Sequence, residues 1–183
     1  MKKLSFLFLL SILSLGLSLS SFHIIKPTLR HHRVITDSTY RIIVDKSDFE
    51  LRVYDSLGWY ATYPVVFGSK DPGDKMFEGD KRTPNGDFKV ILKKIHKQWG
   101  PELLLDYPTR ENLDIFNKRK SEGLIPRNAR IGAGIAIHAT RPQEEWTVDN
   151  YYNWTDGCIS VKYTEMQDLF GYIPVGTKVT IQP

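Results

Sequence analysis

Thr155-Asp156-Gly157-Cys158 is the stretch on which the interpretation of this chain depends, because it contains the only cysteine among 183 residues. Upstream, Gly134-Ile135-Ala136-Ile137-His138 predicts a short strand that ends in a histidine, and a loop runs from there back to the cysteine. A thiol and an imidazole at the two ends of one loop can meet, and a cysteine–histidine pair is an activated nucleophile. Both side chains also have an ordinary interpretation, as a small buried apolar group and a core histidine.

Residues 1–22 predict a signal peptide or a retained membrane anchor. Lys2 and Lys3 precede a run of Leu, Phe, Ile and Ser, which is the pattern of a secretory signal. Extended to Ile25, the run approaches the roughly 20 residues that span a bilayer. We therefore expect export to the periplasm or cell wall, with membrane contact only through this segment. In an oxidising compartment an unpaired cysteine is a free thiol or an intermolecular partner, which favours a functional role for Cys158.

The composition of the remaining chain is that of a globular domain. Hydrophobic residues make up 41% and charged residues 25% of the sequence, values that allow a packed core. The net charge is only +4 and no recognition motif or long basic tract is present, so we expect no nucleic-acid partner. Residues 23–39 predict a linker. Their histidines lie near no cluster of cysteines or carboxylates, so we expect no metal site there.

Residues 40–183 predict one mainly β domain, a sandwich or partly open barrel with two short helices. Strands are expected at 40–44, 50–54, 59–67, 87–95, 134–138, 159–162 and 178–182, from apolar and polar alternation and from β-branched and aromatic runs. The first three strands predict a meander.

Two segments predict helices, and one polar segment predicts a long loop. Thr109 is expected to cap a helix over 110–122, and Thr164-Glu165-Met166-Gln167 has the pattern of a capping box for the second helix. Residues 101–126 are expected to interrupt the β pattern. The polar segment 68–83 predicts a long surface loop.

The loop over 139–157 is rich in aromatic residues: Trp146, Tyr151, Tyr152 and Trp154. Two interpretations stay open. These rings either cover a hydrophobic floor beneath the loop or line a substrate cleft.

The motifs and their order resemble the L,D-transpeptidase catalytic domain, the YkuD-like family of bacterial cell-wall enzymes. "IAIHAT", a loop and "TDGCISV" are similar to the family's histidine, loop and Ser/Thr-His-Gly-Cys signature. Gly79 to Gly86, "GDKRTPNG", is similar to the family's G-D-x-[RK]-T-P-x-G turn, and "IPVGTKV" at 173–179 to its closing turn and strand. The resemblance covers residues 40–183 and implies the L,D-transpeptidase-like β-sandwich.

The resemblance also implies site residues and a reaction. It implies that Cys158 is the nucleophile and His138 the base, that the Gly157 and Cys158 amides form an oxyanion hole, and that the Ala139 carbonyl orients the imidazole. The strands beside His138 and Cys158 must then be neighbours, with the two side chains within hydrogen-bond reach. Cys158 attacks the third residue of a peptidoglycan stem tetrapeptide, D-alanine leaves, and an acceptor amine takes the acyl group. No cofactor or metal is implied, the partners are stem peptides, the role is cell-wall biogenesis and cell shape, and we expect a monomer.

Asp156 departs from the family pattern, which has histidine there, as does Ser160, where the family has Arg or Asn. A carboxylate aimed at the thiol would raise its pKa. We therefore expect Asp156 to turn away and brace the loop, through backbone amides or through Arg141. The alternative is a direct contact to the amine of a diaminopimelate side chain. Thr155 and Trp154 are expected beside the site.

Three other functions remain open to different degrees. Water can resolve the same thioester, which would make the protein an L,D-carboxypeptidase. A non-catalytic wall-binding module is disfavoured by the presence of both the cysteine and the histidine. A papain-like protease is disfavoured further, because the histidine precedes the cysteine here.

Overall fold

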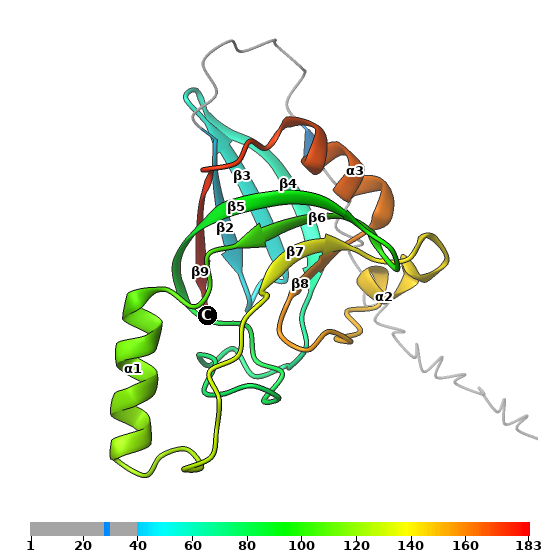
Figure 1. Ribbon diagram of the computed structural model, residues 1–183. Helices are drawn as coiled ribbons and strands as arrows, with labels where there is room; N and C mark the ends of the chain where they lie inside the picture. Colours follow the sequence, from blue (N-terminus) through cyan, green and yellow to red (C-terminus); the bar gives the residue numbers. More distant parts are fainter. Residues whose placement is uncertain (1–27, 30–39) are drawn as a thin grey trace, which may run out of the picture.

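The computed structural model describes residues 28–29 and 40–183, which form one closed sheet with helices outside it (Figure 1). The strands are β1 (Thr28–Leu29), β2 (Arg41–Asp45), β3 (Glu50–Asp55), β4 (Gly58–Val66), β5 (Gly86–His96), β6 (Gly100–Leu105), β7 (Ala136–Ala139), β8 (Ile159–Val161) and β9 (Lys178–Gln182). Their order is β1-β4-β3-β2-β9-β5-β6-β7-β8, and a further pairing of β4 with β8 closes the sheet. The predicted mainly β class is confirmed, with the sandwich closed into a barrel.

The core lies inside the barrel because one side chain in two along each strand is apolar and points inward. β3 shows the pattern, with Leu51 and Val53 fully buried between partly exposed neighbours. Full burial of such a side chain contributes about 1.5–3 kcal/mol. The predicted meander of β2, β3 and β4 is confirmed by their antiparallel pairing, while β2–β9 and β7–β8 are parallel.

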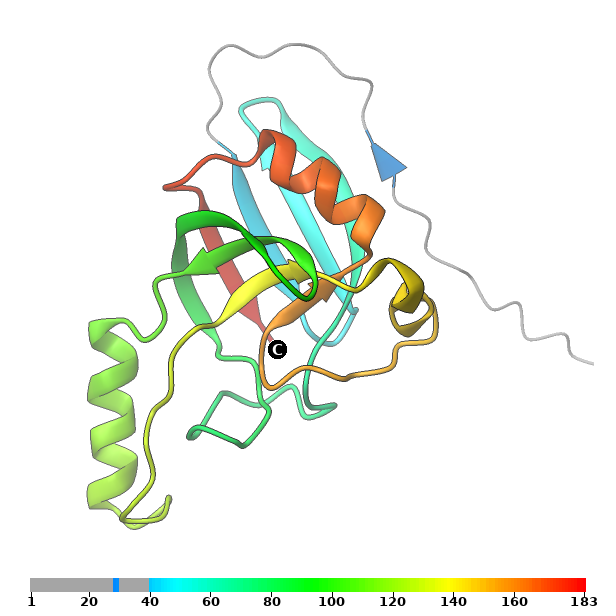
Figure 2. The same ribbon diagram turned by 45° about the vertical axis from the view of Figure 1, so that its right-hand side comes forward.

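Helices α1 (Arg110–Ser121) and α3 (Tyr163–Tyr172) are the two that the sequence predicts. The Thr109 side chain caps α1 by accepting from the Asn112 amide, and α1 stands apart from the barrel in both views (Figures 1 and 2). α3 lies against the barrel and contributes to its core. A third, short helix, α2 (Trp146–Asp149), lies in the loop that was expected to be irregular.

The capping box predicted for α3 is wrong. Lys162 is the N-cap residue and makes no side-chain capping bond. The Thr164 amide and hydroxyl instead donate to the Glu145 carboxylate, at 2.8 and 3.0 Å. Since an orphan N–H at a helix start can donate to any nearby oxygen, a carboxylate from the preceding loop replaces the local cap.

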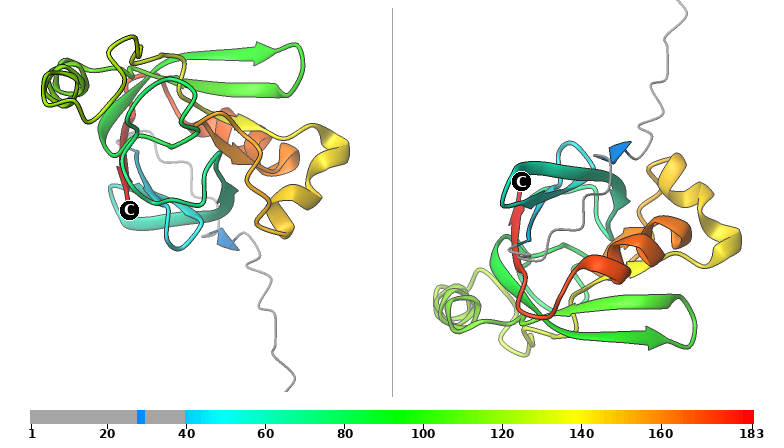
Figure 3. Two further views of the ribbon diagram at one scale, coloured as in Figure 1. Left: turned by 90° about the horizontal axis from the view of Figure 1, so that it is seen from below. Right: turned by 90° about the horizontal axis from the view of Figure 1, so that it is seen from above.

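The expected interruption of the β pattern at 101–126 is wrong in its first part. β6 pairs with β5 from Val90↔Leu105 to His96↔Gly100, as an antiparallel hairpin. The tip of this hairpin projects beyond the barrel (Figure 3). Gly100, with φ 81°, begins the returning strand in a conformation that favours glycine.

The predicted signal peptide or anchor, and most of the predicted linker, lie outside the described residues. Thr28–Leu29 pairs antiparallel with β4. Within the part of the chain that the structure describes, no helix is long and apolar enough to cross a membrane.

Candidate active site

β7 and β8 place His138 and Cys158 on one face of the sheet. The two strands are parallel neighbours, as predicted, with His138 aligned with Ser160. Aligned side chains in a parallel pair share a face, and Cys158 lies two residues before Ser160, so the thiol starts on the imidazole face. Ile137 and Ile159 point the other way, into the core.

The direct thiol–imidazole hydrogen bond that the sequence predicts is absent among the described residues. The Cys158 thiol instead donates to the Gly134 carbonyl, with 3.5 Å between sulfur and oxygen. Catalytic hydrogen bonds are often unformed without substrate, so the arrangement does not exclude His138 as a base.

The imidazole of His138 is held in one tautomer. Its Nδ1 lies 2.8 Å from the Ala139 carbonyl oxygen. A carbonyl only accepts, so Nδ1 carries the proton and the lone pair is on Nε2. This is the contact expected of Ala139, and it leaves Nε2 able to accept a proton.

Two tryptophans flank the imidazole. Trp99 lies with its ring centroid 5.1 Å from that of His138, and Trp154 meets the ring edge-on at 5.4 Å. His96 stacks on Trp99 at 3.7 Å. We call His138, Trp99, Trp154 and Glu102 the imidazole wall.

Trp99 and Glu102 were missed by the sequence analysis because β6 was not recognised. Glu102 is opposite His138 in the β6–β7 pairing and only 4% exposed. Its carboxylate accepts from Trp99 Nε1 at 3.2 Å and pairs with Lys94 at 3.1 Å. The sequence did contain a signal for Glu102, because it is the single acidic residue in the otherwise apolar run 101–105.

Both reacting groups are neutral in the resting site. The pKa of the Cys158 thiol is raised to about 11, chiefly by burial; the Glu102 and Asp156 carboxylates also raise it, while the Ala136 backbone and the Lys75 ammonium lower it. Burial also lowers the pKa of His138, against its hydrogen bond to Ala139 and the field of Glu102. The site therefore holds a thiol and an imidazole at neutral pH, rather than a preformed ion pair.

The turn before the cysteine is fixed by Thr155, which is buried. Its hydroxyl donates to the Cys158 carbonyl at 2.8 Å and accepts from the Gly157 amide at 3.2 Å. The Gly157 N–H donates to the Thr155 hydroxyl in this structure, and its role as an oxyanion donor stays a prediction. Gly157 is also required for its backbone: φ is 125°, and a Cβ there would lie 2.7 Å from the Arg82 carbonyl.

The polar segment 68–83 runs across the end of the barrel beside this turn (Figure 3). Asp80 organises it, because its carboxylate accepts from the Met76, Phe77 and Arg82 amides and pairs with the Lys75 ammonium at 2.8 Å. The Lys75 ammonium also reaches the site, since a Cβ on Gly157 would lie 3.4 Å from it. The family-like "GD" turn is thus part of the site.

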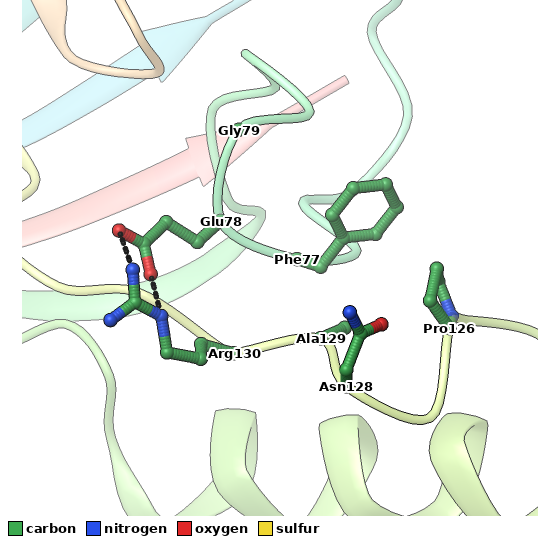
Figure 4. A pocket seen from close by; sticks show the side chains of 7 residues that line it. All are labelled: Phe77, Glu78, Gly79, Pro126, Asn128, Ala129 and Arg130. Atoms are coloured by element: carbon green, nitrogen blue, oxygen red, sulfur yellow. Dashed lines mark hydrogen bonds and ion pairs between the residues drawn. The ribbon is translucent and has the colours of Figure 1, made fainter.

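A cavity of about 400 Å3 opens beside the thiol. Its lining residues are Lys75, Glu78, Gly79, Lys81, Gly132, Ala133, Ile135 and Asp156. Two lining residues, Ala133 and Ile135, flank Gly134, whose carbonyl accepts from the Cys158 thiol. A second cavity of about 420 Å3 shares Glu78 and Gly79 with the first, and at its edge Glu78 and Arg130 point at each other (Figure 4).

Asp156 is placed differently from the expectation. It is exposed, lines the first cavity, and makes no hydrogen bond or ion pair with any residue the structure describes. Arg141 pairs with Glu144 at 2.8 Å instead. Bracing of the loop by Asp156 is therefore wrong, because Arg141 has a partner three residues away and Thr155 and Asn153 hold the loop.

The aromatic residues of the loop do not form one floor. Trp146 and Tyr152 are 52% and 56% exposed and pack on each other. Only Trp154 touches the site, through His138. Among residues 28–29 and 40–183, no group of three or more His, Cys, Asp or Glu side chains is arranged to hold a metal ion.

The structure is a closed, mainly β barrel with His138 on β7 and Cys158 directly before the neighbouring parallel strand β8. The chain belongs to the L,D-transpeptidase catalytic domain family (YkuD), whose model matches residues 39–181. A comparison with curated proteins found no match.

Solved structures share the fold at low sequence identity. Pgp2 of Campylobacter jejuni, a helical cell shape determining protein, is 23% identical with a TM-score of 0.57, over 80% of this chain and 48% of that one. Bd1075 of Bdellovibrio bacteriovorus is 23% identical with a TM-score of 0.52, over 79% and 47%. L,D-transpeptidase 3 of Mycobacterium tuberculosis, in complex with a faropenem-derived adduct, is 12% identical with a TM-score of 0.52, over 80% and 61%. The match thus spans about half the length of the first two.

Proposed function

We propose that the protein transfers acyl groups from peptidoglycan stem peptides through a thioester on Cys158. The observation that carries the proposal is the placement of Cys158 and a tautomerically fixed His138 on one face of neighbouring strands. Membership of the L,D-transpeptidase family supports the substrate class.

In the proposed reaction His138 Nε2 takes the thiol proton as the sulfur attacks the carbonyl of the third stem residue. With a thiol pKa of about 11, the resting thiolate fraction is small, so proton transfer has to accompany attack. The thiol must first leave the Gly134 carbonyl. The tetrahedral intermediate then expels terminal D-alanine, which takes the proton from the imidazolium, and the acyl group stays on sulfur.

The Cys158 backbone amide is the proposed oxyanion donor. The Gly157 amide joins it only if the substrate oxyanion displaces the Thr155 hydroxyl from that N–H. Ala139 acts as a positioning residue, through its carbonyl on His138.

Resolution of the thioester by an amine gives transpeptidation, and resolution by water gives L,D-carboxypeptidase activity. The open, charged cavity beside the thiol favours a second polar substrate and keeps water equally able to enter. The cell-shape role of the Pgp2 neighbour suggests that wall remodelling is the setting for either outcome.

The decisive experiment incubates the purified protein with a disaccharide tetrapeptide and identifies the products by mass spectrometry. A cross-linked dimer shows transpeptidation, and a tripeptide shows hydrolysis. Faropenem, which forms an adduct in the M. tuberculosis neighbour, is the covalent probe. We expect one adduct per wild-type chain and none on Cys158→Ala. Absence of both products and adduct, or an adduct that persists on Cys158→Ala, would refute the proposal.

A further inference from the structure

A row of four side chains crosses the sheet on the face that carries the imidazole. The strands β5, β6, β7 and β8 are neighbours (Figure 1), and their registers align Lys94 with Glu102, Glu102 with His138, and His138 with Ser160. Aligned residues share a face, and directly opposed Cβ atoms in antiparallel strands lie about 4.5–5.5 Å apart. The row therefore places one carboxylate between an ammonium and the imidazole that is proposed to take the thiol proton.

The Glu102 carboxylate is buried, and both of its oxygens are used. One oxygen pairs with the Lys94 ammonium at 3.1 Å, and the other accepts from Trp99 Nε1 at 3.2 Å. No hydrogen bond joins this carboxylate to His138 among the described residues, and the imidazole Nδ1–H is already donated to the Ala139 carbonyl. Glu102 therefore acts on the imidazole as a fixed negative charge and not as a hydrogen-bond partner.

The charge of Lys94 does not cancel that of Glu102 at the imidazole. The Lys94 side chain is 44% exposed, so solvent screens its ammonium, whereas the Glu102 side chain is 6% exposed. The fourth member of the row, Ser160, is uncharged and buried, and its Oγ has no hydrogen-bond partner among the described residues. The net field that the row applies to the imidazole is therefore negative.

The charged groups around His138 agree with this conclusion. Burial is the main influence and lowers the pKa of His138, whereas the bond to Ala139 and the Glu102 carboxylate raise that pKa and His96 lowers it. Helix α3 packs against β6 and β7, and its titratable side chains make no hydrogen bond or ion pair with His138 within the described structure: Tyr163, Glu165, Asp168 and Tyr172. Glu102 thus supplies the negative field at the imidazole.

We propose that Glu102 is a positioning residue whose negative charge stabilises the His138 imidazolium that forms when the Cys158 thiol gives up its proton. The inference deepens the proposed function and rests on its assignment of His138 as the base. A cation that forms on a buried ring loses most of its hydration, so an anion already fixed beside it favours the proton transfer. Trp99 holds this anion in place through its N–H, and its ring lies against the imidazole.

The charge of Glu102 should have opposite effects on two reactions of the same thiol. Acylation by a stem peptide or by faropenem requires the imidazolium, which Glu102 stabilises. Alkylation by iodoacetamide follows the thiolate fraction, which Glu102 lowers because its carboxylate raises the pKa of Cys158. A carboxylate that only supported the fold would not change the two rates in opposite directions.

Glu102→Gln tests the inference, because glutamine keeps the shape and can still accept from the Trp99 N–H. We expect acylation by faropenem near neutral pH to fall by about tenfold and alkylation by iodoacetamide to rise by up to about tenfold, which corresponds to one pKa unit. Glu102→Asp keeps the charge on a shorter side chain and should retain most of the acylation rate. A role in packing alone predicts the reverse order, with glutamine tolerated better than aspartate.

The matched control is Glu111→Gln, the same substitution at an exposed acid on α1, which should change neither rate. Thermal unfolding verifies that each variant is folded. Should Glu102→Gln unfold, the double variant Lys94→Met/Glu102→Gln, which leaves no unpaired ammonium, provides the same test.

A readout without turnover separates this inference from the proposed function. NMR titration of the histidine ring signals, assigned with His138→Ala, measures the pKa of His138, which Glu102→Gln should lower because a nearby anion favours the protonated ring. An unchanged or raised pKa, two rates that change in the same direction, or faster acylation of Glu102→Gln than of Glu102→Asp would overturn the inference. A lowered pKa in a protein whose wild type is inert toward stem peptides and faropenem refutes the proposed function and leaves the charge effect standing. An active wild type with an unmoved pKa refutes this inference only.

Discussion

The two sides of Cys158 differ in almost every physical respect. The imidazole wall holds His138 and Glu102, which are buried on the paired strands β7 and β6, between two partly buried tryptophans, and its one carboxylate is paired. The opposite side is an open cavity built on loops, where Lys81 and Asp156 have no partner among the described residues. Paired strands fix the His138 imidazole, which must accept the thiol proton over a short distance. Loops present the side chains that meet a variable ligand. The comparison teaches that reactivity and selectivity are separable here, and substitutions on each side should show this.

The largest effect is expected on the imidazole wall. His138→Ala should lower the rate of Cys158 acylation by about 10²–10⁴-fold, the usual contribution of a general base. Stopped-flow acylation by faropenem measures this step alone. Lys70→Met, in the 68–83 loop but outside the cavity lining, is the matched comparison and should leave the reaction with faropenem unchanged. A loss below about tenfold for His138→Ala would remove the general base from the mechanism.

Much of the barrel could be predicted from sequence because its signals are local. Alternation in β3 and the cap at Thr109 each depend on a few adjacent residues, and both are confirmed. β6 was missed because Pro101 and a run of three leucines do not alternate. Their strand conformation depends on pairing with β5 and β7, which no local pattern encodes.

The site divides in the same way. Cys158 and His138 were predicted from motifs, and the parallel pairing of their strands is confirmed, while their catalytic roles stay predictions. Lys75, Trp99 and Glu102 were not found, because each reaches the site from a segment distant in sequence. The bracing role of Asp156 failed for the opposite reason, since Arg141 found a nearer partner in Glu144.

A smaller effect should distinguish by sign two charged residues, one on each side of the thiol. Glu102 raises the pKa of the Cys158 thiol and Lys75 lowers it, around a value of about 11. Below that pH the rate of alkylation follows the thiolate fraction. Glu102→Gln should therefore increase the rate with iodoacetamide between pH 7 and 9, and Lys75→Met should decrease it, each by up to about tenfold, or one pKa unit. Lys70→Met is the control, and thermal unfolding verifies that each variant is folded. Shifts of the same sign would show that the two charges do not act on the thiol as described.

The smallest effect on activity is expected at Trp154, in the imidazole wall. Its indole ring packs edge-on against His138, but its buried Nε1 has no hydrogen-bond partner among the described residues. A buried N–H without a partner costs about 1–3 kcal/mol, whereas the ring contributes packing. Trp154→Phe keeps a ring and removes that N–H, so we expect activity within about threefold of wild type and a free energy of unfolding that is unchanged or slightly higher. Trp154→Ala removes the packing as well, and should lower stability by about 3–5 kcal/mol and free the imidazole to rotate. Chemical denaturation and faropenem acylation of both variants measure the two quantities. If Trp154→Phe proves as slow as Trp154→Ala with a stem peptide but not with faropenem, the indole N–H is a donor to the peptide, and Trp154 belongs to substrate selection rather than to the support of His138.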